Sequence, residues 1–419
     1  MEFLWILPVM ISFAGAYFMF KLNFFYLLHP IKTFRKAACC LREKGAFISF
    51  SLALAGTLGI GNIVGVAVGI SVGGAGAVFW IFVSSFFSMI LKYCESSLSS
   101  EIGNGKGMIG IIKSTFGRAS DKISLLYAVL ILLICFFMGA GLQSASICEC
   151  AFATLSLPNK TSALILLFVM AVSLYIGAKK IEKITAIAIP LTTIIYIFLC
   201  ILTVILNFDA LPNAVLRVVR DAFEADSAIG GVFGFFTSKQ IKEGYLRGIL
   251  SNEAGAGTST IAHSLNKSSD SGAVGVMGML EVVFDTFILC MLTAFSALVC
   301  IEDFSNLSGI AIIYKSIGAV IGAVSEYLLL ICIFTFAYST IVCWYYYGRF
   351  AYKHLFGEGR ELVFAFLFLS SVYFGCCIPV EILITLSDII LLMLSAITLS
   401  ALKKNSDRIK TLSERSGLT

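Results

Sequence analysis

AGTLGIGN at residues 55–62 and SNEAGAGT at residues 251–258 are two glycine-rich polar stretches that interrupt apolar segments of membrane length. Each interruption leaves backbone N–H and C=O groups without helical partners. At membrane depth such groups are tolerated only where they are buried in protein or line a solute cavity. The two stretches therefore predict an all-α integral membrane protein with two discontinuous helices, and they favour a transporter.

The composition supports the membrane class. Of the 419 residues, 59% are hydrophobic and only 13% are charged, and the mean hydropathy is +0.96, which exceeds what a soluble core requires. The net charge is +5, but the basic residues gather in short loops between apolar runs. Such loops set membrane orientation, so no nucleic-acid binding is expected. The 13 cysteines form no CxxC pair and no zinc spacing, so neither a disulfide framework nor a metal-ligand cluster is predicted.

The apolar runs predict about eleven transmembrane helices, because crossing ~30 Å of hydrocarbon takes roughly 20 residues. The expected spans are 3–27, 46–71, 75–98, 123–148, 161–178, 184–207, 228–266, 272–301, 321–350, 361–380 and 382–402. Basic clusters at 32–44, 106–122, 179–183 and 403–410 are expected on the cytoplasmic side, which predicts an outside N-terminus and a cytoplasmic C-terminus. Three basic residues on the outer approach to the second break are expected to serve local structure instead: Lys239, Lys242 and Arg247.

The spacing of the two breaks predicts an inverted repeat. Each break opens a set of five spans, and an odd number of spans makes the second set run opposite to the first. We expect one domain over residues 1–419, with an extra N-terminal helix (3–27), a first repeat (46–207), a second repeat (228–402) and a cytoplasmic tail (403–419). Solute and coupling ion are expected at the repeat interface, near the midplane of the membrane.

Seven segments in order carry a family resemblance. They are AGTLGIGNIVGVAVGISVGGAGAVFW (55–80), LKYCESSL (91–98), LQSASI (142–147), GAKKIEKITAIAIP (177–190), RGILSNEAGAGTSTIAH (247–263), FDTFILCMLTAF (284–295) and FAYSTIVCWYYYG (336–348). Together they resemble the alanine or glycine:cation symporter family, the sodium:alanine symporters, within the broken-helix amino acid–polyamine–cation superfamily. The resemblance implies a plasma-membrane, multi-pass symporter.

The first break holds the expected contacts for the carboxylate of an amino acid. The resemblance places four residues where backbone amides meet that carboxylate: Thr57, Gly59, Ile60 and Gly61. Glycine admits the close approach of a ligand to the backbone. By contrast, Gly65 and Gly69 form a small-residue stripe that we expect to serve close helix packing.

The second break is expected to surround the ammonium group and side chain of the amino acid. The residues expected to line it are Ser251, Asn252, Gly255 and Ala256. Glu253 has two interpretations, a functional intramembrane carboxylate or a structural acceptor for freed N–H groups, and the structural one is favoured.

A sodium site is expected where the ninth span meets the first break. Ser339 and Thr340 offer two hydroxyls, and the carbonyl of Phe336 lies one turn earlier. Hard cations require several oxygen ligands, and the resemblance supplies two further carbonyls, those of Ala55 and Leu58. The competing interpretation is that the two hydroxyls bond back to their own helix.

Four further polar or aromatic residues are candidates of lower weight. Gln143 is expected to face protein or cavity near the site, and the resemblance suggests that Trp344 walls the pocket. Asp285 remains open between a functional and a structural role, and His263 is expected to be structural. The chain departs from the family pattern at Ala75, Ala140 and Ala145, and after Asp388, which bears on substrate identity.

The predicted function is import of a small neutral amino acid (alanine or glycine, or else D-alanine or serine) with sodium by alternating access. The partners are then the amino acid, sodium and the lipid bilayer, with sodium as coupling ion and no other cofactor. Two alternatives remain: a proton-coupled symporter that uses Glu253 or Asp285, and a ligand-sensing relic of the fold. No Ser–His–acid set, HExxH or P-loop occurs, so no enzyme is expected.

Overall fold

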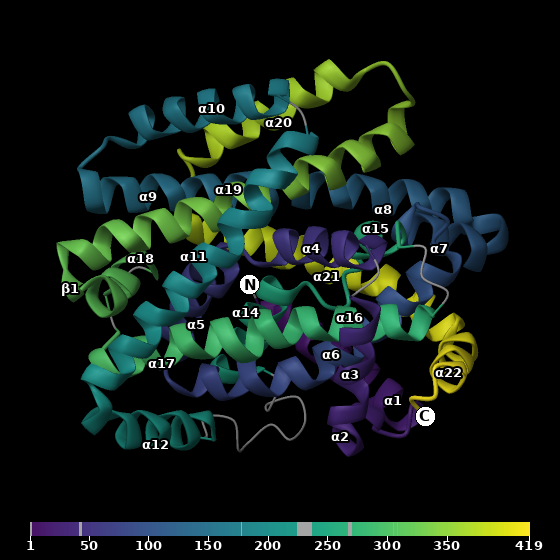
Figure 1. Ribbon diagram of the computed structural model, residues 1–419, viewed down its shortest axis with the longest axis horizontal. Helices are drawn as coiled ribbons and strands as arrows, with labels where there is room; N and C mark the ends of the chain where they lie inside the picture. The colour runs from purple at the N-terminus through teal and green to yellow at the C-terminus, as the bar shows by residue number, and fades with distance from the viewer. Residues whose placement is uncertain are drawn as a thin grey trace.

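The protein is almost entirely helical, as predicted (Figure 1). The computed structural model describes residues 2–41, 44–176, 178–223, 237–266, 270–304, 306–307 and 309–419. Part of the expected broken span, residues 228–236, therefore lies outside the described residues, as do the side chains of the basic cluster at 179–183. Within the described part, the one β-strand is the three-residue β1 (Val320–Gly322).

The helices follow one another with short connections. Up to residue 206 they are η1 (Glu2–Trp5), α1 (Ile6–Lys21), α2 (Phe25–Leu28), α3 (Pro30–Cys40), α4 (Lys44–Thr57), η2 (Ile60–Asn62), α5 (Val64–Gly73), α6 (Gly76–Ile102), α7 (Gly107–Thr115), η3 (Gly117–Ala119), α8 (Ser120–Ile134), η4 (Cys135–Leu142), α9 (Gln143–Leu155), α10 (Asn159–Ile176) and α11 (Ala178–Leu206). Beyond it they are η5 (Phe208–Ala210), α12 (Leu211–Ala222), α14 (Lys239–Asn252), α15 (Thr260–His263), α16 (Ser271–Val282), η6 (Val283–Cys290), α17 (Met291–Cys300), α18 (Gly309–Ile313), η7 (Tyr314–Gly318), α19 (Ala323–Phe356), α20 (Glu361–Gly375), α21 (Val380–Lys404) and α22 (Ser406–Arg415).

The lengths of the helices fit a multi-pass membrane protein. Among the described residues, eight helices are long and apolar enough to cross a membrane, or nine if the bent pair formed by α4 with η2 and α5 counts as one span. Two further expected spans contain shorter helices, the 14 residues of α14 and the 15 of α20. The number of about eleven spans and the inverted repeat therefore stay predictions.

The first expected span, 3–27, ends earlier than predicted. Helix α1 ends at Lys21, and Asn23 and Phe24 have φ angles of 53° and 49°. Left-handed residues cannot continue a right-handed helix. The chain therefore turns into α2 and α3 rather than extending the span.

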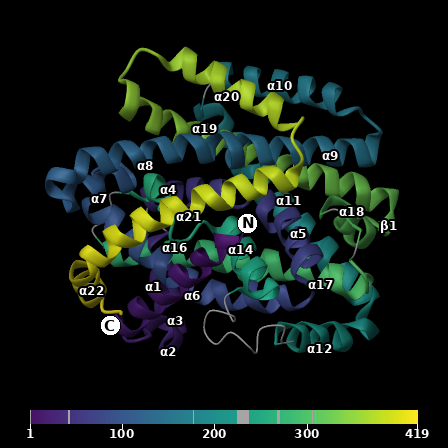
Figure 2. The ribbon, with the colours of Figure 1, turned by 180° about the vertical axis from the view of Figure 1, so that it is seen from behind.

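Two groups of helices surround the breaks. Helix α6 packs against α1, α14 and α16, whereas α19 packs against α8, α9 and α11. Figure 1 shows α10 and α20 together along one edge, beyond α8, α9 and α19, with α6 and α12 towards the opposite edge. Figure 2 shows α21 crossing the rear of the molecule. The buried core runs through both groups, so the breaks lie in the interior.

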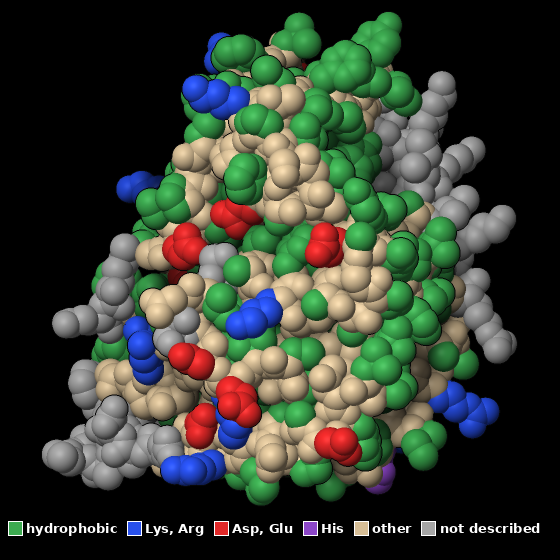
Figure 3. All heavy atoms as spheres, turned by 90° about the vertical axis from the view of Figure 1, so that its left-hand side faces the viewer, with side chains coloured by type: hydrophobic (Ala, Val, Ile, Leu, Met, Phe, Trp, Pro, Cys, Tyr) green, Lys and Arg blue, Asp and Glu red, His purple; other side chains and the backbone are tan. Residues whose placement is uncertain are grey.

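The surface also fits a membrane setting. Exposed large hydrophobic side chains occur along α10, α11 and α20, including Phe168, Ile194 and Phe366 at 70%, 65% and 71% exposed. One end of the molecule, viewed in Figure 3, gathers acidic and basic side chains over its middle and carries apolar ones along its right flank. Apolar flanks with charged ends are what a bilayer requires.

Candidate functional site

The first break is a sharp bend in an otherwise apolar helix. Helix α4 ends at Thr57, Gly59 is extended (φ −129°, ψ −159°), and α5 starts at Val64 after the short η2. The two halves are bent by 56°. The bend frees backbone groups from the helical ladder, including the carbonyls of Ala55 and Leu58, for contacts with other elements.

The second break is longer and starts at a left-handed residue. Helix α14 ends at Asn252, Glu253 has φ 54°, and α15 begins only at Thr260. The Asn252 Oδ1 accepts from the N–H of Ala254 at 2.9 Å, and the Glu253 carboxylate accepts from the Thr258 hydroxyl. Side chains of the break itself therefore satisfy part of its own polar surface.

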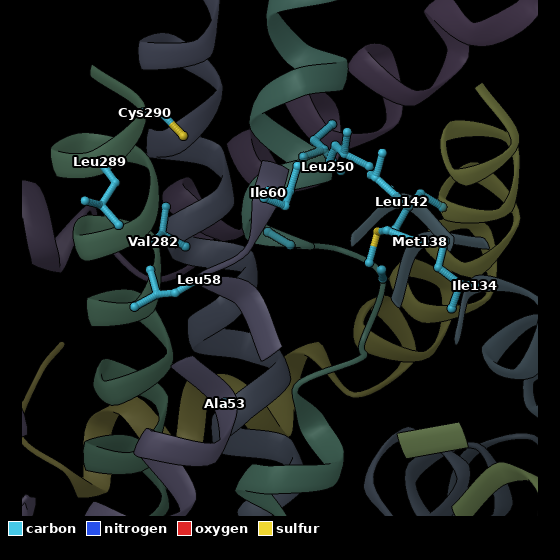
Figure 4. Close-up of a cluster of buried hydrophobic side chains, with 14 of the residues drawn as sticks. Ala53, Leu58, Ile60, Ile134, Met138, Leu142, Leu250, Val282, Leu289 and Cys290 are labelled. Atoms are coloured by element: carbon cyan, nitrogen blue, oxygen red, sulfur yellow. The ribbon is translucent and has the colours of Figure 1, made fainter. Parts of the chain in front are cut away.

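The two breaks meet and enclose a small cavity. A Cβ on Gly61 would lie 3.1 Å from the Cα of Ser251, so the two chains touch backbone to backbone. The lining residues are Gly56, Thr57, Gly59, Gly61, Met138, Leu142, Gln143, Leu250, Glu253 and Thr340. Figure 4 shows Met138 and Leu142, from the π-helical segment η4, near Leu250, with Ile60 close by. Polar groups and broken backbone thus converge in one apolar enclosure.

Oxygen atoms gather beside this cavity where α19 passes the first break. The Thr340 hydroxyl donates to the carbonyls of Ala55 and Leu58 at 3.2 and 3.3 Å. One residue earlier, the Ser339 hydroxyl donates to the Phe336 carbonyl at 2.8 Å. Ser339 bonds back to its own helix, as the competing interpretation has it, whereas Thr340 reaches the first break.

Gln143 joins the start of α9 to the first break. Its side-chain oxygen accepts from the N–H of Ile60 at 3.1 Å, and its amide nitrogen donates to the Met138 carbonyl at 3.3 Å. A Cβ on Gly59 would lie 3.1 Å from that oxygen and 2.9 Å from the Thr340 hydroxyl. The expectation that Gln143 faces protein or cavity is confirmed.

Asp285 connects the two breaks, a role that the sequence left open. One carboxylate oxygen accepts from the Asn62 side chain at 2.6 Å, and the other accepts from the hydroxyls of Ser251 at 2.6 Å and Thr286 at 2.9 Å. The residue is fully buried in the π-helical segment η6, and such segments often mark functional sites. Its membrane depth was the sequence signal; its partners were not visible there.

A second buried polar group lies behind the second break. Lys92 on α6 contacts the Glu281 carboxylate at 3.2 Å and the Ser259 hydroxyl at 2.9 Å. The other oxygen of Glu281 meets His263. All these side chains are buried, so each charge depends on its partners. His263 is structural here, as expected.

Three expected site residues face away from the cavity. A Cβ on Gly255 would meet Ile11 of α1, and the Ala256 carbonyl accepts from the hydroxyls of Tyr127 and Thr398 at 3.0 Å each. Trp344 is buried against Gly139, behind the lining. The remaining second-break residues, Ser251 and Asn252, bond to Asp285 and Thr286. The structure thus gathers the first-break residues, Gln143 and Thr340 around the cavity, and leaves these three outside it.

Comparison with known proteins adds a direct family match. The family model described as the sodium:alanine symporter family matches residues 1–411. The chain belongs to the sodium:alanine symporter family. As a member of this transporter family with several membrane-length apolar helices, it is a multi-pass membrane protein.

Relatives of this symporter family member cover most of the chain. It is 28% identical to a probable sodium/glutamine symporter GlnT of Bacillus subtilis, over 96% of this chain and 86% of that protein. It is 26% identical to a sodium/alanine symporter AgcS of Methanococcus maripaludis, over 82% of this chain and 77% of that protein. It is 27% identical to an uncharacterized transporter of Haemophilus influenzae, over 93% and 88% of the two chains.

Solved structures share the architecture. A mutant of the Eremococcus coleocola manganese transporter superposes with a TM-score of 0.52 at 13% identity, over 84% of this chain and 75% of that one. At that identity the likeness shows the fold alone. The symporter family member therefore shares its fold with a transporter of known structure.

Proposed function

We propose that this protein is a sodium-coupled symporter of a small neutral amino acid. The observation that carries the proposal is the meeting of the Thr340 hydroxyl with the Ala55 and Leu58 carbonyls, directly beside a cavity lined by both breaks. An ion and a solute held at one bend reinforce each other, because each orders backbone that the other contacts.

For sodium, the proposed ligands are oxygen atoms of two elements. The Thr340 hydroxyl turns its hydrogen away from the carbonyls of Ala55 and Leu58, and its oxygen then faces the ion together with theirs. Ser339 and the Phe336 carbonyl lie on the adjacent turn of α19 and complete the proposed set. Neutral and carbonyl oxygens suit a monovalent hard cation.

For the amino acid, the cavity offers both signs of polarity. The Ile60 N–H now donates to the Gln143 oxygen, and a substrate carboxylate would replace that acceptor at the break. Glu253 lines the same cavity and supplies a carboxylate for the ammonium group. The cavity is small and otherwise apolar, which favours a short neutral side chain; the relatives named for alanine and for glutamine transport support a neutral amino acid.

Driving force requires no nucleotide. An inside-negative potential of about 100 mV supplies about 2.3 kcal/mol per charge, which corresponds to roughly 40-fold accumulation with one co-transported cation. The predicted orientation, with the N-terminus outside and the C-terminus cytoplasmic, makes the direction import across the plasma membrane.

Uptake of labelled alanine into proteoliposomes tests the proposal, with an imposed sodium gradient compared with a matched proton gradient. We expect sodium-driven uptake, and we expect Thr340→Ala to reduce it at least about tenfold, the loss of roughly 1.4 kcal/mol of ion binding. Thr335→Ala is the matched control, because this hydroxyl on the same helix bonds back to the Ile331 carbonyl.

Other outcomes would point to the alternatives. Uptake driven equally well by protons without sodium would replace sodium with proton coupling. Amino-acid binding without uptake under either gradient would favour the ligand-sensing relic.

A further inference from the structure

Two cysteines from distant parts of the sequence lie side by side. The Sγ atoms of Cys148 on α9 and Cys376 just after α20 are 2.8 Å apart. This separation is within about 1 Å of the bonded sulfur–sulfur length of about 2.05 Å. Both side chains are buried, and no disulfide joins them in the structure.

The backbone around the two thiols is packed tightly. A Cβ added to Gly375 would lie 2.5 Å from the Cα of Gly141 and 2.6 Å from the Ser144 hydroxyl. The Cys376 thiol also approaches the Ser144 carbonyl at 3.5 Å. The end of α20 is therefore fixed against η4 and α9, and the two sulfurs are held together rather than meeting by chance motion.

The predicted orientation places both thiols near the outer surface. The expected span 123–148 runs outwards and ends at Cys148, and the expected span 361–380 also runs outwards and contains Cys376 near its end. Extracytoplasmic surfaces are the places where disulfides form and persist.

We propose that Cys148 and Cys376 form a disulfide that links α9 to the end of α20. The reaction is thiol–disulfide exchange with a small-molecule or protein disulfide, RSSR. The two cysteine sulfurs lose two electrons and their two protons and form one S–S bond, while RSSR gains both and leaves as two RSH. The neighbouring Cys377 is exposed and offers the first point of attack for the oxidant.

The link would brace the wall of the proposed site. Gln143 lies five residues before Cys148 in the sequence of α9, and η4 packs against α20. The two cysteines are 228 positions apart, and cross-links across long loops restrict the unfolded chain most. Since α9 and α20 belong to the same packed group, the link is compatible with the motion assumed under the proposed function, on which this clause alone depends.

Mapping of free thiols tests the proposal. The full-length protein, purified without reductant, is denatured in N-ethylmaleimide, digested and analysed by mass spectrometry. We expect unlabelled Cys148 and Cys376 in one cross-linked peptide, released by dithiothreitol. Labelling of both residues in the unreduced protein, or a link from Cys148 to Cys377 instead, would overturn the proposal.

Matched variants identify the pair. Cys148→Ser should abolish the link, whereas Cys150→Ser on the same helix and Cys377→Ser beside the partner should retain it. Loss of the link in Cys377→Ser would also count against the assigned pair.

Thermal unfolding provides a second readout that needs no transport. Reduction should lower the melting temperature by at least about 2 °C, and the double variant Cys148→Ser/Cys376→Ser should melt at the same temperature with or without reductant. An unchanged melting temperature on reduction would contradict the bracing role. Failure of uptake would leave both results intact, so the two proposals fail separately.

Discussion

At the scale of single residues, the site depends on atoms that stand very close to the backbone. Gly59 faces the two polar groups that we assign to ion and solute, the Thr340 hydroxyl and the Gln143 amide oxygen. Glycine at this position leaves both groups free, because any side chain would occupy the space between them.

Replacing Gly59 by alanine should therefore damage both parts of the site. The new Cβ would lie 2.9 Å from the Thr340 oxygen and 3.1 Å from that of Gln143, closer than carbon and oxygen pack without strain. We expect sodium-driven alanine uptake to fall at least about tenfold, about 1.4 kcal/mol in binding. Gly318→Ala is the control, since its Cβ would meet Tyr314 at an ordinary 3.4 Å; equal uptake by the two variants would refute the assignment.

Asp285 is the second residue whose removal has a defined cost. In Asp285→Ala, the buried Asn62 amide and Ser251 hydroxyl lose their acceptor, and each unsatisfied buried group costs about 1–3 kcal/mol. We expect a lower melting temperature and strongly reduced uptake. Asp285→Asn keeps one carbonyl oxygen and should recover part of the stability, measured by thermal unfolding in detergent. A wild-type melting temperature for the alanine variant would show that the two breaks are held together by other contacts.

At the scale of helices, a row of glycines on the first broken helix faces the second. Added Cβ atoms on Gly61, Gly69 and Gly73 would meet Ser251, Arg247 and Glu243 respectively, so the two helices run in opposite directions. The expectation that Gly69 serves close packing is confirmed. The close approach also brings Arg247 to Asp388 on α21, where the two charges pair at 2.5 Å, which confirms the local structural role expected for Arg247.

Two alanine substitutions on this row should behave differently. In Gly69→Ala the Cβ would lie 2.5 Å from the Cγ of Arg247, whereas in Gly65→Ala it would lie 3.6 Å from a methyl of Leu250, an ordinary contact. We expect Gly69→Ala to displace Arg247 from Asp388 and destabilise the protein by about 1–3 kcal/mol, and Gly65→Ala to change stability little. Thermal unfolding of both variants measures the difference, and the reverse order would contradict this helix packing.

At the scale of the whole molecule, the two ends of the chain are fastened to the start of α16. Lys36 on α3 lies 2.9 Å from Asp270, and the Ser416 hydroxyl donates to the same carboxylate at 2.5 Å. A second tie joins Lys21 on α1 to Asp407 on α22 at 2.6 Å. Asp270 also caps α16 by accepting from the N–H of Ala273.

Asp270→Asn should loosen the C-terminal segment. Burial alone would raise the pKa of Asp270, but hydrogen bonds from Ser416 and Lys36 outweigh it and lower the pKa below 3.8. A lowered folded-state pKa stabilises the protein above the unfolded value of about 3.9, and this contribution is lost as the pH falls further through the folded pKa. We expect faster tryptic cleavage at 408–415 in the variant at pH 7.

The outer tie provides the control for that experiment. Lys410→Ala removes a charge whose partner, Glu414, lies on the same exposed turn of α22, and it should leave cleavage at the remaining basic sites unchanged. Cleavage of Asp270→Asn at the wild-type rate would show that the carboxylate does not hold the tail.

The sequence by itself determined the membrane class, the two breaks and the hydroxyl pair on the ninth span, because hydropathy, glycine and polar side chains at membrane depth are local properties of the chain. It also directed attention to Thr340, Gln143 and the first-break glycines. Only the tertiary structure decided that Thr340 meets carbonyls 285 and 282 positions away, that Asp285 joins both breaks, and that Gly255 and Ala256 turn towards other helices. Such contacts depend on how helices cross and rotate about their axes, and a composition or spacing pattern within one helix does not encode the neighbour on its other side.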